Sequence, residues 1–486
     1  MSTRLPLAVA IAGALLVSAC ASTHGLQPAT TPNDPASLPV AHSLAGIPLS
    51  DAAFPRQDWW HALGDPQLDG LIDEALRGTP SLAAADARVR KAQAQAGLAD
   101  AARKPTIGAS GQYALAELPE GLAGDEIGGK LLRNAVLMMK FDLPLDVWGG
   151  KRAQYEAALD QVHASQIEAQ AARLTLAANI ARAYVALAQA FDTQQLIQRE
   201  QARSAQLQRL AQQRVDAGID NRMTLRNTEA AVASAKAQAD AAQQQIDALR
   251  TTLAVLLGQG PDRGLAIQRP HLLQAAAPAL PSVLPSELLG HRPDVVAARW
   301  RVEAAAQGIA SAKASFKPSI DLSALVGLAS TGFSDLFRSD ALLGFGGPAI
   351  SLPIFDGGRL RNNLSARDAD YDLAVADYDA TAVQALREVV DALQTIRALD
   401  AQRAALEQAD SAARAAFDLV NARHQAGMSS TIDVLAAQKP VLQIQQQLAT
   451  LRAQRYAAGI DLNRALGGGL AVDVPNPTAS NDAAKH

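Results

Sequence analysis

Two glycine-containing stretches have the spacing of nucleotide-binding motifs. Residues 124–130 read G-x-x-x-x-G-K, the pattern in which backbone N–H groups and a lysine hold phosphates. Leu131 follows where that motif needs Ser or Thr, and no strand-to-helix setting surrounds it. Residues 344–349 read G-x-G-x-x-A but lead into a predicted strand instead of opening a helix. We interpret the first stretch as a turn and the second as small residues where strands pack closely.

The other residues that could do chemistry are dispersed. The single cysteine excludes a disulfide framework and a cysteine-based zinc cluster. Lys and Arg number 44 against 48 Asp and Glu, so the chain lacks the strongly basic face that binds nucleic acid. No histidine has an i, i+4 partner; they stand at His24, His42, His61, His163, His271, His291, His424 and His486. We expect no metal, no cofactor, no nucleic-acid partner and no enzymatic activity.

The cysteine ends an N-terminal apolar segment. One positive charge in residues 1–4 precedes an apolar run over residues 5–17 and the sequence Val17-Ser18-Ala19-Cys20. The run is too short for a spanning helix, and its small-residue end is typical of signal-peptide cleavage. It is similar to a bacterial lipobox, in which the cysteine thiol is acylated and becomes the mature N-terminus. Ala21 follows where an acidic residue would indicate retention at the inner membrane. The alternative is an ordinary secretory signal with a chance cysteine.

The chain contains two copies of one unit. Thr79-Pro80 opens a helical stretch that ends at Lys104-Pro105, and Arg292-Pro293 opens another that ends at Lys317-Pro318. Both proline spacings are 25 residues, at an offset of 213. Further along, residues 143–145 read L-P-L and residues 352–354 read L-P-I, at an offset of 209. Repetition at one period indicates one structural unit used twice.

Each copy predicts a helix followed by two strands. The first helix spans 80–104, because proline suits a first helical turn and Pro105 disfavours helix before it. Two segments then alternate apolar and polar residues over about ten positions, which is typical of transmembrane β-strands. In the first copy one face holds Ile107, Ala109, Tyr113 and Leu115, and then Leu137, Met139, Phe141, Leu143 and Leu145. The second copy repeats this pattern from Ile320 and again over 342–354.

Very long helices follow Gly149-Gly150 and Gly357-Gly358. The first runs to Gly218, about 67 residues or roughly 100 Å, and a second helix over 219–257 adds roughly 58 Å. Helix 80–104 is roughly 37 Å long. The two shorter helices together match the long one, so we predict that they stack end to end beside it. This arrangement is a helical column.

Four strands per chain do not close a barrel, since closure needs at least about eight. In lipid, each unpaired N–H or C=O group at an open edge costs several kcal/mol. The chain is therefore expected to oligomerise. The strand count is compatible with a barrel made from two, three or four copies of the chain.

Residues 59–72 read W-W-x-x-L-G-D-P-x-L-D-x-L-I, and residues 280–294 read L-P-x-x-L-P-S-E-L-L-x-x-R-P-D. With the run 305–320, these blocks resemble the outer-membrane factors of the TolC superfamily, and more narrowly the NodT-type lipoprotein subunits of tripartite efflux pumps. The resemblance covers almost the whole mature chain. It implies a homotrimer, with a twelve-stranded outer-membrane β-barrel continuous with a twelve-helix periplasmic α-barrel.

The expected organisation follows from this resemblance. It comprises a lipoprotein signal peptide (1–19), a lipidated tether and equatorial segment (20–78), a first repeat (79–258), a Pro-rich equatorial linker (259–290), a second repeat (291–467) and a C-terminal tail (468–486). The implied function is a passive conduit for small molecules in a Gram-negative outer membrane, with a periplasmic adaptor and an inner-membrane RND-type transporter as partners. The expected lipid is covalent, on Cys20.

Two other functions are alternatives. A protein-secretion conduit serving an ABC transporter has similar architecture, but the lipobox and the L-P-S-E-L-L block favour efflux. A periplasmic adaptor is also helical and can be lipidated, but it lacks four membrane strands. The transported substrate cannot be inferred from the sequence, because a passive tunnel needs no binding pocket.

The far ends of the long helices are a predicted gate. Gly218 and Gly427 suit the reversals between paired helices, since glycine tolerates the left-handed conformation that ends a helix. Arg214 and Arg423, one turn earlier, are cations that suit a helix C-terminus. Asp433 lies in a segment similar to the family stretch that carries constricting aspartates. The family's second acidic position corresponds to Ala436, a neighbouring basic position to Ser429, and its acidic partner in the first repeat to Thr224. The resemblance therefore does not carry over the ion-pair lock of some relatives.

Asp433 has a simpler explanation. Ser430 lies three residues before it, which is the spacing of a helix cap, and an acid in the first turn complements the helix dipole. The sequence leaves the gate and the cap as competing interpretations of this carboxylate.

Overall fold

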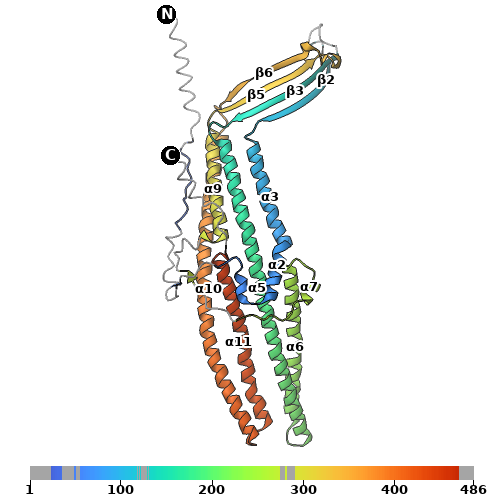
Figure 1. Ribbon diagram of the computed structural model, residues 1–486, viewed down its shortest axis with the longest axis vertical. Coiled ribbons are helices and arrows are strands. Elements are labelled where there is room, and N and C mark those ends of the chain that lie inside the picture. The colour runs from blue at the N-terminus through green and yellow to red at the C-terminus, as the bar shows by residue number, and fades with distance from the viewer. Residues whose placement is uncertain are drawn as a thin grey trace.

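The computed structural model describes residues 23, 25–34, 49–50, 55–117, 119, 121, 129, 131–273, 280–281 and 290–469. The chain is an elongated column, with a sheet at one end and two helix turns at the other (Figure 1). Cys20, the predicted lipid acceptor, lies outside the described residues.

The helices form two matched sets. Each set has a helix of 22 residues, one of 67 and one of 35. They are α3 (Pro80–Ala101), α5 (Gly150–Asp216) and α6 (Arg222–Leu256), then α9 (Pro293–Ala314), α10 (Arg359–Gln425) and α11 (Thr431–Ala465). The predicted helices are confirmed, with ends shifted by up to three residues. Helix α3 stops before 104 because Arg103 and Lys104 donate i→i−3 bonds ahead of Pro105, which disfavours continued helix.

The shorter helices of each set abut end to end beside the long one. At the first junction a Cβ on Gly258 (φ +71°) would lie 2.8 Å from Cδ of Pro80. At the second, a Cβ on Gly467 (φ +92°) would lie 2.0 Å from the carbonyl oxygen of His291. Both glycines are needed for the turn and for the close approach. Figure 1 shows α3 and α6 in line along α5, as the length match predicts.

The four predicted strands form one antiparallel sheet. They are β2 (Thr106–Glu117), β3 (Leu131–Leu145), β5 (Ser319–Ser330) and β6 (Leu342–Ser351), paired in the order β2-β3-β5-β6. The register places Ile107 opposite Phe141, Phe141 opposite Ala324, and Ala324 opposite Gly346. Because directly opposed residues share a face, the odd residues of β2 and β3 lie with the even residues of β5 and β6.

One face of this sheet is predominantly apolar, and its charged residues Glu117 and Arg133 lie at the end of the β2–β3 pair that adjoins the turn. Its large side chains are Ile107, Tyr113, Leu115, Leu137, Met139, Phe141, Leu143, Leu145, Ile320, Leu322, Val326, Leu328, Leu342 and Ile350. The opposite face carries Ser110, Gln112, Asp321, Ser323 and an ion pair between Lys140 and Asp142 at 2.9 Å. Apolar-out, polar-in alternation is the pattern of a membrane barrel wall.

Both edges of the sheet are open within the described chain, since β2 and β6 each pair on one side only. Pro348 lies in β6, where a residue without an N–H group is tolerated because the strand is at an edge.

The largest core lies at mid-height, where the motif at 59–72 packs on α5 and α6. Its short helices are η2 (Trp59–Leu63) and α2 (Pro66–Gly78), and Leu68, Ile72 and Leu253 are fully buried. Asp65 caps α2 by accepting from the Gln67 amide at 3.0 Å. Its other oxygen accepts from the Tyr184 hydroxyl and the His271 amide, both at 2.7 Å. The motif is therefore a packed joint that holds the chain against α5.

Smaller elements complete this level and the sheet turn. They are β1 (Leu49–Ser50), which pairs in parallel with β4 (Leu280–Pro281), α7 (Asp262–Leu265), η3 (Phe333–Asp335) and η4 (Ser339–Ala341). One 18-residue window of α5 is apolar enough to pass for a membrane span, and 56% of that window is buried inside the chain. Because more than half of it is buried inside the chain, we interpret this window as part of the packed interior.

Candidate channel tip and equatorial joint

The two helix reversals have the same backbone geometry. Gly218 (φ +69°) follows the end of α5, and Gly427 (φ +74°) follows the end of α10. After each glycine the next amide bonds back to the arginine one turn earlier: Ile219 to the Arg214 carbonyl and Met428 to the Arg423 carbonyl, both at 2.8 Å. This 6→1 bond is the Schellman arrangement, which needs a left-handed residue and explains the two glycines.

The first reversal is held by side chains as well. The Arg214 guanidinium lies 3.3 Å from the Asp220 carboxylate, and Asp220 also accepts from the Thr224 hydroxyl at 3.0 Å. Asn221 caps α6 by accepting from the Thr224 amide at 3.1 Å. The pKa of Asp220 lies below its usual value, because its carboxylate accepts hydrogen bonds from the Asn221 backbone N–H first, and then from the Thr224 hydroxyl and Arg214. Thr224 thus donates its amide to the Asn221 cap and its hydroxyl to Asp220.

Asp433 forms the helix cap that its spacing predicts. Its Oδ2 atom accepts from the amide and the hydroxyl of Ser430, both at 2.8 Å, and its own amide donates to the Ser430 oxygen at 3.3 Å. This is a complete capping box at the start of α11. The side-chain and backbone bonds from Ser430 lower the pKa of Asp433, so its carboxylate stays ionised at neutral pH. Asp433 is exposed at the tip.

A buried arginine ties the helices together above the tip. Arg203 on α5 is 7% exposed, binds Glu200 through two bonds of 2.7 and 2.5 Å, and donates to the Leu435 carbonyl of α11 at 3.2 Å. No sequence pattern predicts this role, because Arg203 is one of many arginines in an Ala- and Gln-rich helix. It links the first turn of α11, which carries Asp433, to the long helix of the other repeat.

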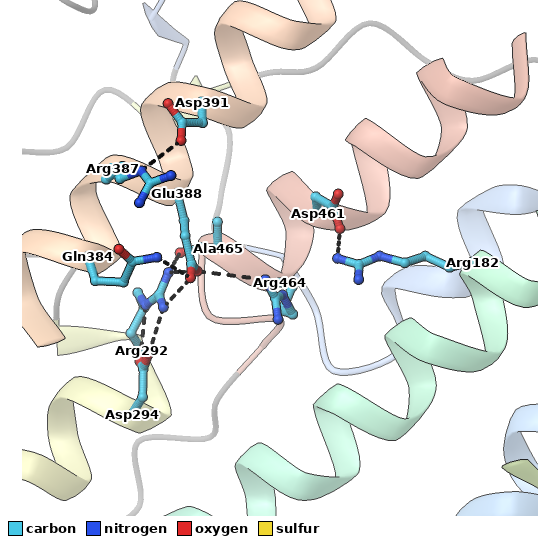
Figure 2. Close-up of polar contacts among 10 residues, drawn as sticks. All are labelled: Arg182, Arg292, Asp294, Gln384, Arg387, Glu388, Asp391, Asp461, Arg464 and Ala465. Atoms are coloured by element: carbon cyan, nitrogen blue, oxygen red, sulfur yellow. Dashed lines mark hydrogen bonds and ion pairs between the residues drawn. The ribbon is translucent and has the colours of Figure 1, made fainter. Parts of the chain in front are cut away.

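The equatorial end of the second repeat has a denser network around Arg292 (Figure 2). This guanidinium is 7% exposed and binds Asp294 at 3.0 and 2.6 Å. It also donates to Glu388 of α10 at 3.0 Å and to the carbonyl oxygen of Ala465 at 3.2 Å. Arg292 therefore joins the start of α9, the middle of α10 and the end of α11. Its cation also complements the negative end of the α11 dipole.

A second pair lies beside this network. Figure 2 shows Arg182 of α5 in an ion pair with Asp461 of α11, and Arg464 reaching Glu388 at 3.9 Å. Burial, followed by the charge of Arg464, lowers the pKa of Arg182. These contacts connect the first repeat to the second at the same height.

The first repeat has no equivalent of Arg292. At the offset of 213 its place is taken by Thr79, which is buried and packs against Gly258. Both junctions thus pack closely at a glycine, and the second has in addition the ion pairs of Arg292. The family block at 280–294 includes Arg292, and its burial was not evident from the sequence.

The nucleotide-like stretches do not form nucleotide sites. Gly344 and Gly346 lie within β6, and a Cβ on Gly346 would lie 3.0 Å from the Ala324 side chain, as close strand packing predicts. Gly129 is in a turn, and the rest of residues 122–130 is not described. Within the described ranges no three His, Cys, Asp or Glu residues are grouped so as to hold a metal.

A sheet with an apolar outer face, long paired helices and two equivalent units define a channel of the outer membrane. The family model for outer membrane efflux proteins matches residues 71–259 and again 284–468, so the chain belongs to that family. The double match agrees with the two structural repeats. The chain is accordingly an outer-membrane efflux channel component, of the kind found in tripartite pumps.

Individual relatives and solved structures support the same family assignment. The fusaric acid resistance protein FusA of Burkholderia cepacia is 37% identical over 76% of this chain and 70% of its own length. The multidrug resistance outer membrane protein MdtP of Escherichia coli K12 is 29% identical over 96% of this chain and 97% of its own. Among solved structures, VceC of Vibrio cholerae is 35% identical with a TM-score of 0.79, covering 86% of this chain and all of that one. The efflux prediction is confirmed, and these relatives do not favour protein secretion.

Proposed function

We propose that three copies of this chain close a twelve-stranded barrel in the outer membrane and a helical tunnel below it, through which small molecules leave passively. The observation that carries this proposal is the four-stranded sheet with one apolar face and two open edges. In lipid those edges have to pair, and pairing β6 of one copy with β2 of the next leaves none unpaired. Three copies are also what the family resemblance implies.

The test is the assembly itself. Full-length protein extracted in mild detergent is expected to give trimers in native mass spectrometry and stepwise conductance in planar bilayers. A stable monomer or dimer as the main species, or protein that inserts without conducting, would contradict the proposal.

A periplasmic adaptor fits the tips. Ile219 and Met428 occupy equivalent places after the two glycines and are 67% and 65% exposed. Apolar side chains held out at a tight turn are costly in water and suit a protein partner. We infer that the adaptor contacts these turns and couples the channel to an RND-type transporter of the inner membrane. Ile219→Ser with Met428→Ser is expected to abolish co-purification of the adaptor and leave the trimer intact.

A covalent lipid on Cys20 is consistent with the docked N-terminal segment. Asp372 of α10 accepts from the Ala29 and Thr30 amides at 3.1 and 2.9 Å, and Asp379 accepts from the Asn33 amide at 3.1 Å. Leu26 packs near Phe316, just below the sheet. Leu26 lies six positions after Cys20, a reach of at most ~20 Å, so an acyl chain there can enter the membrane beside the strands. We propose no other cofactor.

Intact mass tests this anchor. The mature protein is expected to exceed the polypeptide of residues 20–486 by the lipid, and Cys20→Ser is expected to remove the increment. An unmodified N-terminus elsewhere would refute acylation without affecting the channel proposal.

Relatives are named for resistance to fusaric acid, for multidrug resistance and for pyoverdine export. We propose that this chain likewise exports small organic molecules. Deleting the gene is expected to raise the cellular retention of such compounds, and the wild-type gene is expected to restore export.

A further inference from the structure

Apolar side chains are exposed at the base of the sheet, where each repeat passes from strand to long helix. Val147 and Trp148 follow β3, and Ile354 and Phe355 follow β6. All four are exposed, Phe355 at 91% and Trp148 at 47%. In water such a group is unfavourable, whereas aromatic rings gather where the apolar layer of a membrane meets its polar surface.

Trp148 is held in a defined position across the two repeats. Its indole Nε1 donates to the Pro318 carbonyl at 2.7 Å, one residue before β5 begins. The Nζ atom of Lys317 lies 4.8 Å from the centroid of the same ring. This cation–π contact fixes a positive charge directly beside an exposed aromatic group at the foot of the sheet.

This charge is not neutralised as it is in the first repeat. There Lys104 pairs with Asp100 at 2.5 Å. The equivalents at the offset of 213 are Lys317 and Lys313, so a second cation replaces the acid. Within the part of the chain that the structure describes, no carboxylate lies within ion-pair distance of Lys313 or Lys317. Burial raises the pKa of Asp368, and the Lys313 charge opposes this from beyond ion-pair distance.

We propose that Lys317 and Trp148 bind the phosphate group of an anionic phospholipid at the periplasmic boundary of the outer membrane. This inference rests on the proposed barrel, which places the start of β5 at the membrane surface. The Lys317 ammonium group lies over the exposed Trp148 ring, so the cation and the apolar surface are side by side, as the headgroup level of a membrane requires. An unpaired cation there attracts anionic lipid, and the indole supplies the apolar contact for the glycerol and upper acyl region.

The experiment measures lipid retention by the full-length trimer in native mass spectrometry. The probes are phosphatidylglycerol and phosphatidylcholine with the same acyl chains. The parent is expected to retain phosphatidylglycerol preferentially, and an excess of inorganic phosphate is expected not to displace it. Lys317→Gln is expected to weaken phosphatidylglycerol retention about fivefold, and to leave phosphatidylcholine retention unchanged. Lys317→Arg is expected to keep the preference, and Trp148→Leu to reduce retention of both lipids.

Lys140→Gln is the matched control, because it removes one charge from the polar face of the same sheet. It is expected to retain phosphatidylglycerol like the parent. The proposal is overturned if Lys317→Gln retains this lipid normally, or if Lys140→Gln weakens it equally. It is also overturned if Lys317→Gln alters only the ion selectivity of the channel, which would place Lys317 in the lumen. Failure of the parent to form trimers contradicts the barrel instead, and is seen in the same spectra.

Discussion

Arg292 and Glu388 are joined by two hydrogen bonds of 3.0 Å between the start of α9 and the middle of α10. The same guanidinium binds the last residue of α11, so one side chain closes the junction where two short helices meet beside a long one. The corresponding junction of the first repeat is closed by Thr79 and Gly258 without a charge. The two repeats of the chain therefore share a backbone plan and differ in how their joints are held.

Arg292→Ala is expected to lower the free energy of unfolding by about 2–3 kcal/mol, because it removes the buried guanidinium and its hydrogen bonds to Glu388 and to the Ala465 carbonyl oxygen. Arg387→Ala, one residue before Glu388, removes an exposed pair with Asp391 and is expected to cost ~0.5 kcal/mol or less. Thermal melting of the two trimers, followed by circular dichroism, distinguishes them. Equal melting temperatures would show that Arg292 is not the main support of this joint.

Two substitutions distinguish the role of the Asp433 charge from the role of its carboxylate in the capping box. Asp433→Asn removes the charge, and Ser430→Ala removes the hydroxyl of the capping box while the carboxylate stays. If three Asp433 carboxylates ring the closed tip, Asp433→Asn lowers the cation preference of the channel in planar bilayers, and Ser430→Ala does not. If Asp433 acts only as a helix cap, both variants weaken the start of α11 and neither changes the reversal potential of the channel.

Asp160 gives the folded chain a pH dependence. Burial, then the charges of Glu303 and Glu156, raise the pKa of Asp160 from 3.8 to about 7. The native state therefore binds a proton that the unfolded chain has released between about pH 4 and 7, and stability falls as the pH rises through that window. Asp160→Asn is expected to flatten this part of the melting profile. Asp247→Asn, an exposed substitution on α6, is expected to follow the parent.

The docked N-terminal segment depends on two carboxylates seven residues apart. Asp372→Ala and Asp379→Ala each remove acceptors of backbone amides in residues 29–33. Together they are expected to lower hydrogen-exchange protection there about tenfold. Asp370→Ala, two residues before Asp372 on the same helix, breaks a pair with Arg367 and serves as control. Unchanged protection in the double variant would mean that apolar contacts such as that of Leu26 hold the segment.

Periodic features were readable from the sequence because they depend on local backbone rules. Two copies of one unit, helices ending before prolines, glycines at the reversals and strands with alternating faces all follow from spacing along the chain. The observed register places Ile107, Phe141 and Ala324 on one face, as their alternation predicts. The length match between long and short helices also predicted the end-to-end stacking, since the rise per residue is constant.

Only the tertiary structure decided which individual polar residues matter. Arg292 and Arg203 sit in runs of similar charged residues, and what distinguishes them is burial against carboxylates and carbonyls far away in the chain. Asp433 was ambiguous for the same reason: its spacing from Ser430 allowed a cap, and the folded turn shows that cap formed. The Trp148–Lys317 contact joins residues of different repeats, so no local pattern announces it. Spacing determines the backbone plan, whereas the environment of a charge exists only once distant segments have packed together.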